Sequence, residues 1–216
     1  MQLTLEEIFG KWDGFEYKER RQKSYKLVYG IGTNDSPFQV MPTKQTRHPA
    51  YICWSNMLLR ASAYSGYRDK YPTYFNVTCC EDWLLFTNFA KWFKDNYIKD
   101  CQLDKDLLCK DNKIYSPKTC LFIPQEINKF LTLSSKARGL YSIGVHKKST
   151  TSSFSSQIDS NNTKKHLGYF DTQEEAHKAW QKAKLEQAIA FNFPPLQRII
   201  DQLKFEIENN LETTSL

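Results

Sequence analysis

The sequence predicts an α+β protein in which helices flank a small strand-loop-strand-helix unit and a three-stranded antiparallel sheet packs on one helix. Three observations support this fold class. Apolar residues recur at helical spacing in 48–63 and 80–97. Short apolar runs alternate with turn-forming residues over 103–124 and again over 140–170. A helix-capping sequence follows the second of these regions directly.

The composition fits a folded chain and excludes several classes of protein. Of the 216 residues, 40% are hydrophobic and 14% aromatic, with only 8 Gly and 8 Pro, so the chain is neither disordered nor collagen-like. It has no apolar run of transmembrane length and no signal-peptide pattern at its start. We therefore expect a cytoplasmic protein that is not secreted and has no membrane partner.

The six cysteines are expected to be reduced thiols in that compartment. Structural zinc sites use cysteine pairs separated by two to four residues. This sequence has an adjacent pair, Cys79 and Cys80, and otherwise scattered single cysteines. Zinc is therefore not the metal that the sequence favours.

Two amphipathic helices are expected in the first half of the chain. The range 48–63 is entered through Pro49, and proline suits the first position of a helix. The range 80–97 carries an aromatic stripe. We expect both stripes to form core; they consist of Tyr51, Trp54, Met57, Leu58 and Ala61 in the first helix and of Trp83, Phe86, Phe89, Ala90 and Phe93 in the second. The sequence assigns no role to residues 1–47.

A strand-loop-strand-helix unit follows. Apolar runs at 103–108 and 119–124 flank a polar loop and are typical of two strands. A short helix is expected to begin at Pro124. The small and polar residues of 131–139 then predict a linker.

This unit carries an unusual density of polar side chains. Asp104 and Asp106 lie two residues apart on the first expected strand, so they would point to the same face. Asn112 lies in the loop and Asn128 lies one turn into the helix. Phosphodiester hydrolysis needs a divalent cation, and Mg²⁺ prefers oxygen ligands. The residues thus suggest a nuclease, with a solvated strand edge and an asparagine cap as the alternative.

The second half of the chain predicts three antiparallel strands and a helix. The strands are expected at 140–146, 154–158 and 166–170. Thr172 and Glu175 form a capping box at the start of the following helix. After Pro194 and Pro195, the range 194–212 predicts an amphipathic helix that either caps the core or mediates a homodimer.

The basic charge is concentrated around these strands. The chain carries 30 Lys and Arg against 24 Asp and Glu, a net charge of +6. Between residues 134 and 168 the only acid is Asp159, and the basic residues are Lys136, Arg138, Lys147, Lys148, Lys164 and Lys165. A local excess of this kind predicts an anionic partner.

The strand-loop-strand-helix unit and three stretches upstream of it resemble a known family. These stretches are LDKDLL (103–108), NKIYSP (112–117), TCLFIP (119–124) with Asn128, and upstream WSNMLLR (54–60), PTY (72–74) and CEDW (80–83). They resemble the ββα-metal core of phage-encoded HNH homing endonucleases. The resemblance implies an HNH-like nuclease domain at 48–130 that hydrolyses phosphodiester bonds with Mg²⁺ or Mn²⁺.

Carried over by position, the resemblance assigns roles to five residues. Asp104 or Asp106 would stand where the general base or first metal ligand lies, Asn112 would be the loop amide and Asn128 the metal ligand on the helix. Lys105 would hold phosphate as a point charge. The chain departs from the family because no histidine occurs between Cys53 and Val145. An aspartate accepts a proton poorly unless burial raises its pKa.

The region 140–190 resembles a second family. The matching stretches are IGV (143–145), FSSQI (154–158) and HLGYFDTQEEAHKAW (166–180). They resemble the Apetala/ethylene-response-factor type DNA-binding domain, which occurs attached to phage HNH endonucleases. The resemblance implies a three-stranded sheet, packed on one helix, that lies in the major groove of double-stranded DNA. The DNA-binding residues would be Arg138, His146, Lys147, Lys148, Ser156, Lys164 and Lys165.

Lysines stand on these strands where the family largely has arginines. A lysine attracts phosphate but lacks the planar fork that reads a base. We therefore expect binding that depends mainly on phosphate contacts and falls steeply with salt.

Together the two resemblances imply a DNA endonuclease, located in the cytoplasm of a bacterial host if it is encoded by a phage. The absent histidine favours an alternative, a catalytically inactive DNA-binding protein that acts as a transcriptional repressor or competitor. A zinc-structured, partner-binding module built on the cysteines is a third alternative.

Overall fold

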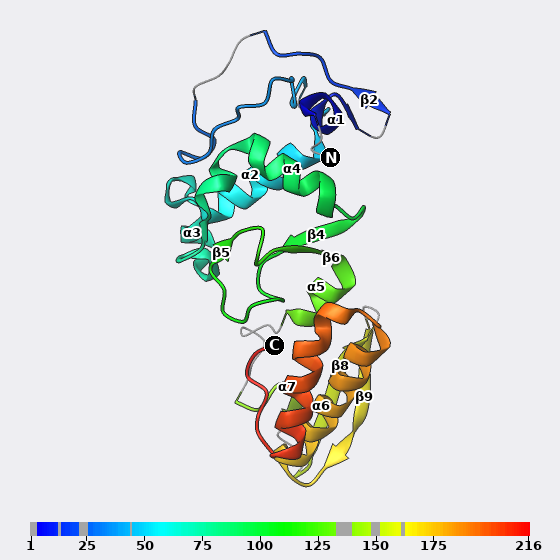
Figure 1. The fold of residues 1–216 in the computed structure, drawn as a ribbon. Helices are drawn as coiled ribbons and strands as arrows, with labels where there is room; N and C mark the ends of the chain where they lie inside the picture. The colour runs from blue at the N-terminus through cyan, green and yellow to red at the C-terminus, as the bar shows by residue number, and fades with distance from the viewer. Residues whose placement is uncertain are drawn as a thin grey trace. The chain divides into compact units, whose positions relative to one another are not determined.

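The computed structural model describes residues 4–12, 14–21, 26–43, 45–132, 140–147, 152–160 and 163–216. They form a mixed α+β fold with several small sheets, one of them three-stranded and antiparallel, as the sequence predicts at this level (Figure 1). The chain divides into two units, Met1–Gln125 and Glu126–Leu216. In the part of the chain that the structure describes, no helix has both the length and the apolar character needed to cross a membrane.

The first unit combines short helices with three two-stranded sheets. The strands β1 and β2 pair antiparallel, as do β4 and β6, whereas β3 and β5 pair parallel. The elements are α1 (Leu5–Phe9), β1 (Lys11–Trp12), β2 (Phe15–Glu16), α2 (Pro49–Ala61), η1 (Ala63–Ser65), α3 (Tyr67–Lys70), η2 (Pro72–Tyr74), β3 (Thr78–Cys79), η3 (Glu81–Leu84), α4 (Phe86–Asn96), β4 (Cys101–Asp104), β5 (Ile114–Tyr115) and β6 (Leu121–Pro124).

The helix predicted at 48–63 is confirmed as α2. Pro49 occupies its first turn, and His48 caps it by accepting a hydrogen bond at Nδ1 from the N–H of Ala50 at 3.2 Å. His48 is only 1% exposed, and this burial lowers its pKa to about 4. At neutral pH the ring is therefore uncharged and can act as the acceptor in this cap.

The helix predicted at 80–97 is interrupted, which corrects the sequence-based expectation. Leu85 is extended and forms a parallel bridge with Thr33, so the range splits into the 3₁₀ turn η3 and the helix α4. Asp35 then takes over the capping of α4, because its Oδ1 accepts a hydrogen bond from the N–H of Thr87 at 2.8 Å. The residues that break and cap this helix lie about fifty positions upstream, beyond the reach of local periodicity.

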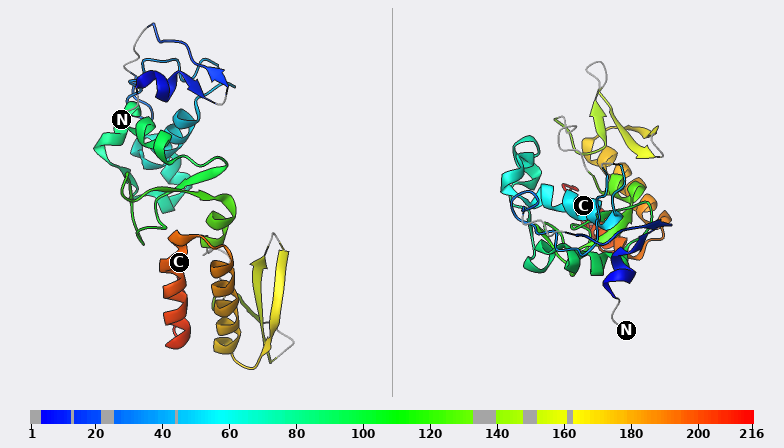
Figure 2. Two further views of the ribbon diagram at one scale, coloured as in Figure 1. Left: turned by 45° about the vertical axis from the view of Figure 1, so that its right-hand side comes forward. Right: turned by 90° about the horizontal axis from the view of Figure 1, so that it is seen from above.

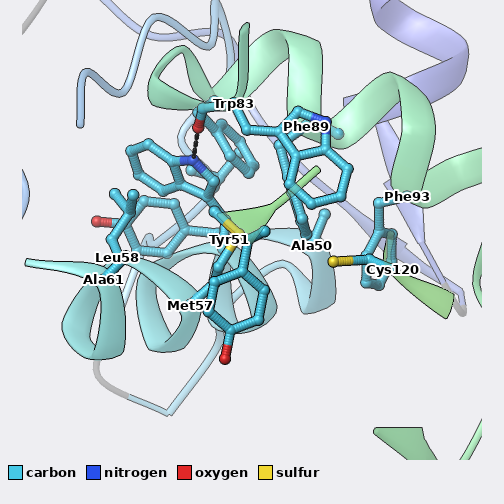
Figure 3. Close-up of a cluster of buried hydrophobic side chains, with 14 of the residues drawn as sticks. Ala50, Tyr51, Met57, Leu58, Ala61, Trp83, Phe89, Phe93 and Cys120 are labelled. Carbon is cyan, nitrogen blue, oxygen red and sulfur yellow. Dashed lines mark hydrogen bonds between the residues drawn. The ribbon is translucent and has the colours of Figure 1, made fainter. Parts of the chain in front are cut away.

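Aromatic side chains of α2, η3 and α4 form the core of the first unit, and both predicted stripes are buried. At the centre, the indole Nε1–H of Trp54 donates to the carbonyl oxygen of Trp83 at 2.6 Å. Figure 3 marks this bond beside Trp83 and shows the rings of Trp83 and Phe89 close together. Ile8, Phe9 and Val40 belong to the same cluster. Residues from the range 1–47 therefore contribute to this core.

The second unit contains most of α5 (Gln125–Leu131), followed by β7 (Val145–Lys147), β8 (Phe154–Ser160), β9 (Thr163–Phe170), α6 (Gln173–Ala190), η5 (Pro194–Leu196) and α7 (Gln197–Glu208). Residues 133–139 of the predicted linker lie outside the described residues. The strands form an antiparallel sheet in the order β7-β8-β9. Figure 2 shows α6 between this sheet and α7.

The capping box of α6 is confirmed. The N–H of Glu175 donates to Thr172 Oγ1 at 3.2 Å, and the N–H of Thr172 donates to Glu175 Oε2 at 3.3 Å.

The first strand begins at Val145, five residues later than predicted, because Gly144 turns the chain there with φ +81°.

The last helix, α7, packs on α6 of the same chain. Ile199 and Leu203 of its apolar stripe are fully buried, whereas Phe205 and Leu211, which follow them, stay exposed. Part of the stripe thus serves the fold of this unit, and the homodimer through this helix stays a prediction.

Gly144 provides a test of the packing between the sheet and α6. A Cβ atom at Gly144 would lie 2.1 Å from Cδ1 of Trp180. We expect Gly144→Ala to lower the free energy of unfolding of the second unit by about 2–4 kcal/mol, measured by urea denaturation. Gly66→Ala is the control, because Gly66 also has a positive φ, of +67°, but no described atom lies within 4 Å of a Cβ there. Gly66→Ala should lower the free energy of unfolding of the first unit by about 1 kcal/mol. Equal losses of unfolding free energy in the two variants would contradict this account.

Candidate functional site

Strand β4 ends at Asp104, the first residue of the candidate site. Asp104 Oδ1 accepts hydrogen bonds from the N–H groups of Asp106 at 3.0 Å and Leu107 at 2.7 Å. An aspartate that bonds the backbone in this way stabilises a turn and ends a strand. The predicted strand at 103–108, with both aspartates on one strand face, is therefore wrong: Asp106 lies in the loop that follows.

Lys105 points into the protein and is only 6% exposed. Its Nζ donates to Asp106 Oδ1 at 2.5 Å and to the carbonyl oxygen of Asn112 at 2.9 Å. The ammonium group therefore holds the loop together from the inside. This position argues against the predicted contact between Lys105 and a substrate phosphate.

Asn112 closes the same loop. Its Nδ2 donates to the carbonyl oxygens of Lys105 at 2.7 Å and Ile114 at 2.8 Å, and its Oδ1 accepts from the N–H of Ile114 at 3.1 Å. Tyr115 of β5 is buried beside this loop, and β5 pairs with β3. The structure thus brings Asp104, Lys105, Asp106 and Asn112 into one loop anchored to the core.

The two carboxylates differ in their surroundings. Asp106 is exposed, whereas Asp104 is half-buried. Burial raises the pKa of Asp104, and the negative charge of Asp106 adds to this effect, while the hydrogen bonds from the two N–H groups and the charge of Lys105 oppose it. Within the described residues, both hydrogen bonds to Asp104 fall on Oδ1. Its Oδ2 is therefore available to another partner.

The two carboxylates are the candidate metal ligands of this loop. No group of three His, Cys, Asp or Glu side chains suited to a metal ion occurs among the residues that the structure describes. Mg²⁺ is often held by one or two carboxylates together with waters and substrate phosphates, which matches Asp104 and Asp106. The predicted third ligand, Asn128, lies on α5 in the second unit. Its role as a metal ligand therefore stays a prediction.

Three of the cysteines of the first unit, Cys53, Cys79 and Cys120, have thiols whose surroundings disfavour ionisation. Burial raises the pKa of Cys53 and of Cys120 to about 12. Burial also raises the pKa of Cys79, whose Sγ lies 4.0 Å from the Sδ of Met57. Zinc binds the thiolate form, which these surroundings disfavour.

The three-stranded sheet has one covered face and one exposed face. Val145, Ser156 and Ile158 are buried against α6. Since neighbouring residues of a strand point to opposite faces, and paired residues share a face, the strand pairing defines the exposed face. It carries His146 from β7, Ser155, Gln157 and Asp159 from β8, and Lys164, His166 and Tyr169 from β9.

Two of the seven predicted DNA-binding residues, His146 and Lys164, lie on this exposed face. Arg138 and Lys148 lie outside the described residues. The other three occupy strand positions on the α6 side of the sheet; they are Lys147, Ser156 and Lys165. Ser156 is buried, which argues against its predicted contact with DNA, whereas Lys147 and Lys165 are exposed, so their contact with DNA stays a prediction.

Each of these three residues has a different environment on that side. Ser156 is completely buried. Lys147 Nζ lies 4.4 Å from the ring centroid of Phe154. Lys165 lines a small pocket with residues of α6. Lys165 lies on the α6 side because β9 contains a bulge. The pairing passes from Ser156↔Gly168 to Gln157↔His166, which leaves one residue of β9 unpaired. Every residue of β9 before the bulge therefore points to the opposite face from the one that regular pairing would give it.

The exposed face includes an aromatic pair that the sequence analysis did not select. Tyr169 is 69% exposed, and its ring lies 4.7 Å from that of His166. Strand alternation could have indicated it, because Tyr169 pairs with Ser155, which pairs with His146. Among the described residues, this face therefore combines one lysine and one aspartate with rings and small polar groups, and it is less basic than the sequence predicts.

No family model matches this sequence, and no curated protein or solved structure matches it either.

The loop offers a direct test of the role of Asn112. We expect Asn112→Ala to lower the free energy of unfolding of the first unit by about 1–3 kcal/mol, because it removes three hydrogen bonds and leaves the carbonyl of Lys105 without its donor. Asn96→Ala is the control, since it removes one hydrogen bond from an exposed helix end. Denaturation curves that shift equally for both variants would argue against the anchoring role.

Proposed function

We propose that this protein is a DNA-binding, HNH-like endonuclease that hydrolyses phosphodiester bonds with Mg²⁺ or Mn²⁺. One observation carries the proposal. An antiparallel pair, β4 and β6, is followed directly by a helix, α5, and a half-buried aspartate ends the first strand beside a folded loop. This strand-loop-strand-helix order is what the family resemblance implies.

The roles of the residues follow from their positions. Asp106 is exposed and offers carboxylate oxygens to a divalent ion, and Oδ2 of Asp104 either shares the ion or accepts a proton from the attacking water. When bound, the ion polarises the phosphate and stabilises the leaving oxygen. Lys105 and Asn112 act as positioning residues, because they hold the loop that carries both carboxylates.

The exposed face of the sheet would hold double-stranded DNA. Lys164 supplies a charge for phosphate, and His146, Gln157 and Tyr169 supply polar and aromatic groups to the groove. Proteins that read DNA with a β-sheet place strands in a groove in this way.

A second candidate is a DNA-binding protein that does not cleave, acting as a repressor or competitor. The position of Lys105 favours it, because the ammonium group is bound to one of the two carboxylates. The absence of histidine from this part of the sequence favours it as well. Cleavage and binding must therefore be measured separately.

The first test is nicking of supercoiled plasmid DNA in Mg²⁺ or Mn²⁺. Asp104→Asn keeps an acceptor for the two backbone N–H groups but removes the charge, so we expect the loop to stay folded and the nicking rate to fall by about 100-fold or more. The control is Asp111→Asn in the same loop, where φ is +59°, a conformation that asparagine tolerates. Nicking by Asp104→Asn at the wild-type rate would exclude the proposed site, and metal-independent binding without nicking by the wild type would favour the second candidate.

The second test compares two adjacent lysines on opposite faces of β9. We expect Lys164→Gln to weaken binding to duplex DNA and to reduce the slope of log K against log salt by about 1. Lys165→Gln removes the same charge on the α6 side and should leave the slope unchanged. Fluorescence anisotropy at several salt concentrations measures both. An equal effect of the two substitutions would show that the exposed face is not the DNA-binding face.

A further inference from the structure

The first unit contains a pocket of about 510 Å³ that the proposed nuclease site does not use. It lies between the β1-β2 hairpin and the end of α4. Four of its lining residues are basic and exposed, and they are Lys11, Arg47, Lys94 and Lys99. Among the described residues that line the pocket none is acidic. The pocket therefore has a positive potential.

The wall of the pocket is aromatic and firmly packed. The ring of Trp12 lies 5.5 Å from that of Phe93 and 5.4 Å from that of Tyr97, so the hairpin is fixed against α4. His48 lies underneath, with its ring 5.1 Å from Trp12 and 5.1 Å from Tyr17. Burial keeps His48 neutral at neutral pH, since its pKa falls to about 4. The support beneath the pocket therefore adds no charge of its own at neutral pH.

An aromatic ring and a cation are presented together at the pocket. Phe15 is 41% exposed, and its ring contacts Tyr17 edge-on at 4.6 Å, which leaves ring surface open to solvent. Lys94 Nζ lies 5.2 Å from the ring centroid of Trp12. Within the part of the chain that the structure describes, Lys11 forms a long, exposed ion pair with Glu16, at 3.8 Å. Such exposed pairs are weak, so an anion competes for Lys11 at little cost.

We propose that this pocket binds an unpaired nucleotide of a single DNA strand, with the base against the aromatic wall and the phosphate among the lysines. Its volume lies in the range of pockets that hold one small ligand. Single-stranded nucleic acid is bound by alternating cations and aromatic rings, because every base offers a π-face. An acidic peptide would use the cations but not the rings. The choice of DNA rests on the proposed function.

The experiment measures fluorescence anisotropy of a labelled oligothymidylate with the full chain, beside an oligonucleotide of equal length that carries abasic sites. We expect Lys94→Gln with Lys99→Gln to weaken binding of the oligothymidylate about tenfold. The matched control, Lys70→Gln with Lys118→Gln, removes two exposed charges of the same unit outside the pocket and should change affinity less than about twofold.

A second variant separates stacking from charge. Phe15→Leu keeps an apolar side chain at an exposed position and removes the ring. It should weaken binding of the oligothymidylate about fivefold or more and leave binding of the abasic strand unchanged. Equal loss on both strands, equal loss in the two lysine pairs, or competition by polyglutamate as strong as that by unlabelled oligothymidylate would overturn the inference.

The outcome is independent of the tests of the nuclease. A wild-type protein that neither nicks plasmid nor binds duplex, but in which Phe15→Leu discriminates the two strands, would support the pocket and refute the proposed function. A protein in which Lys164→Gln weakens duplex binding, while the pocket variants bind single strands normally, would refute the pocket alone.

Discussion

The first unit depends on one feature of its backbone, the interruption of helical structure at Leu85, between η3 and α4. Because the helix is interrupted there, carbonyl groups before α4 need donors from elsewhere. The indole of Trp54 donates to Trp83, the N–H of Thr33 donates to Leu84, and the carbonyl of Thr33 accepts from Phe86. Buried backbone groups are costly when unpaired, so these bonds join α2, the N-terminal segment and α4 into one core.

Packing against α4 sets the positions of both candidate sites of the first unit. Its outer end supplies Lys94 and Tyr97 to the basic pocket. On another side, the ring of Phe122 from β6 lies 5.7 Å from that of Trp92 and 5.4 Å from that of Phe93. Since β6 pairs with β4 over four residues, this packing also determines where β4 runs and where Asp104 ends it. The loop beyond Asp104 is then held by a buried lysine, whose charge needs partners inside the protein.

In the second unit the decisive constraint is the alternation of side chains along strands. Adjacent residues of a strand point to opposite faces of the sheet. Lys164 and Lys165 therefore place their charges on different faces. The bulge in β9 selects which of them faces outward. Among the described residues, the exposed face that results has one lysine, one aspartate and an aromatic pair rather than a concentration of positive charge.

The sequence by itself determined the α+β class, the buried stripes of α2 and α4, the capping box at Thr172 and the presence of three antiparallel strands, because each depends on residues within about a turn or a strand of one another. It did not determine the break at Leu85, the end of β4 at Asp104 or the side of the sheet on which Ser156 lies. The pocket likewise could not be predicted from local patterns, because Trp12 and Tyr97, which are far apart in the sequence, line it together. These features depend on hydrogen bonds and packing between distant segments, which only the tertiary structure decides.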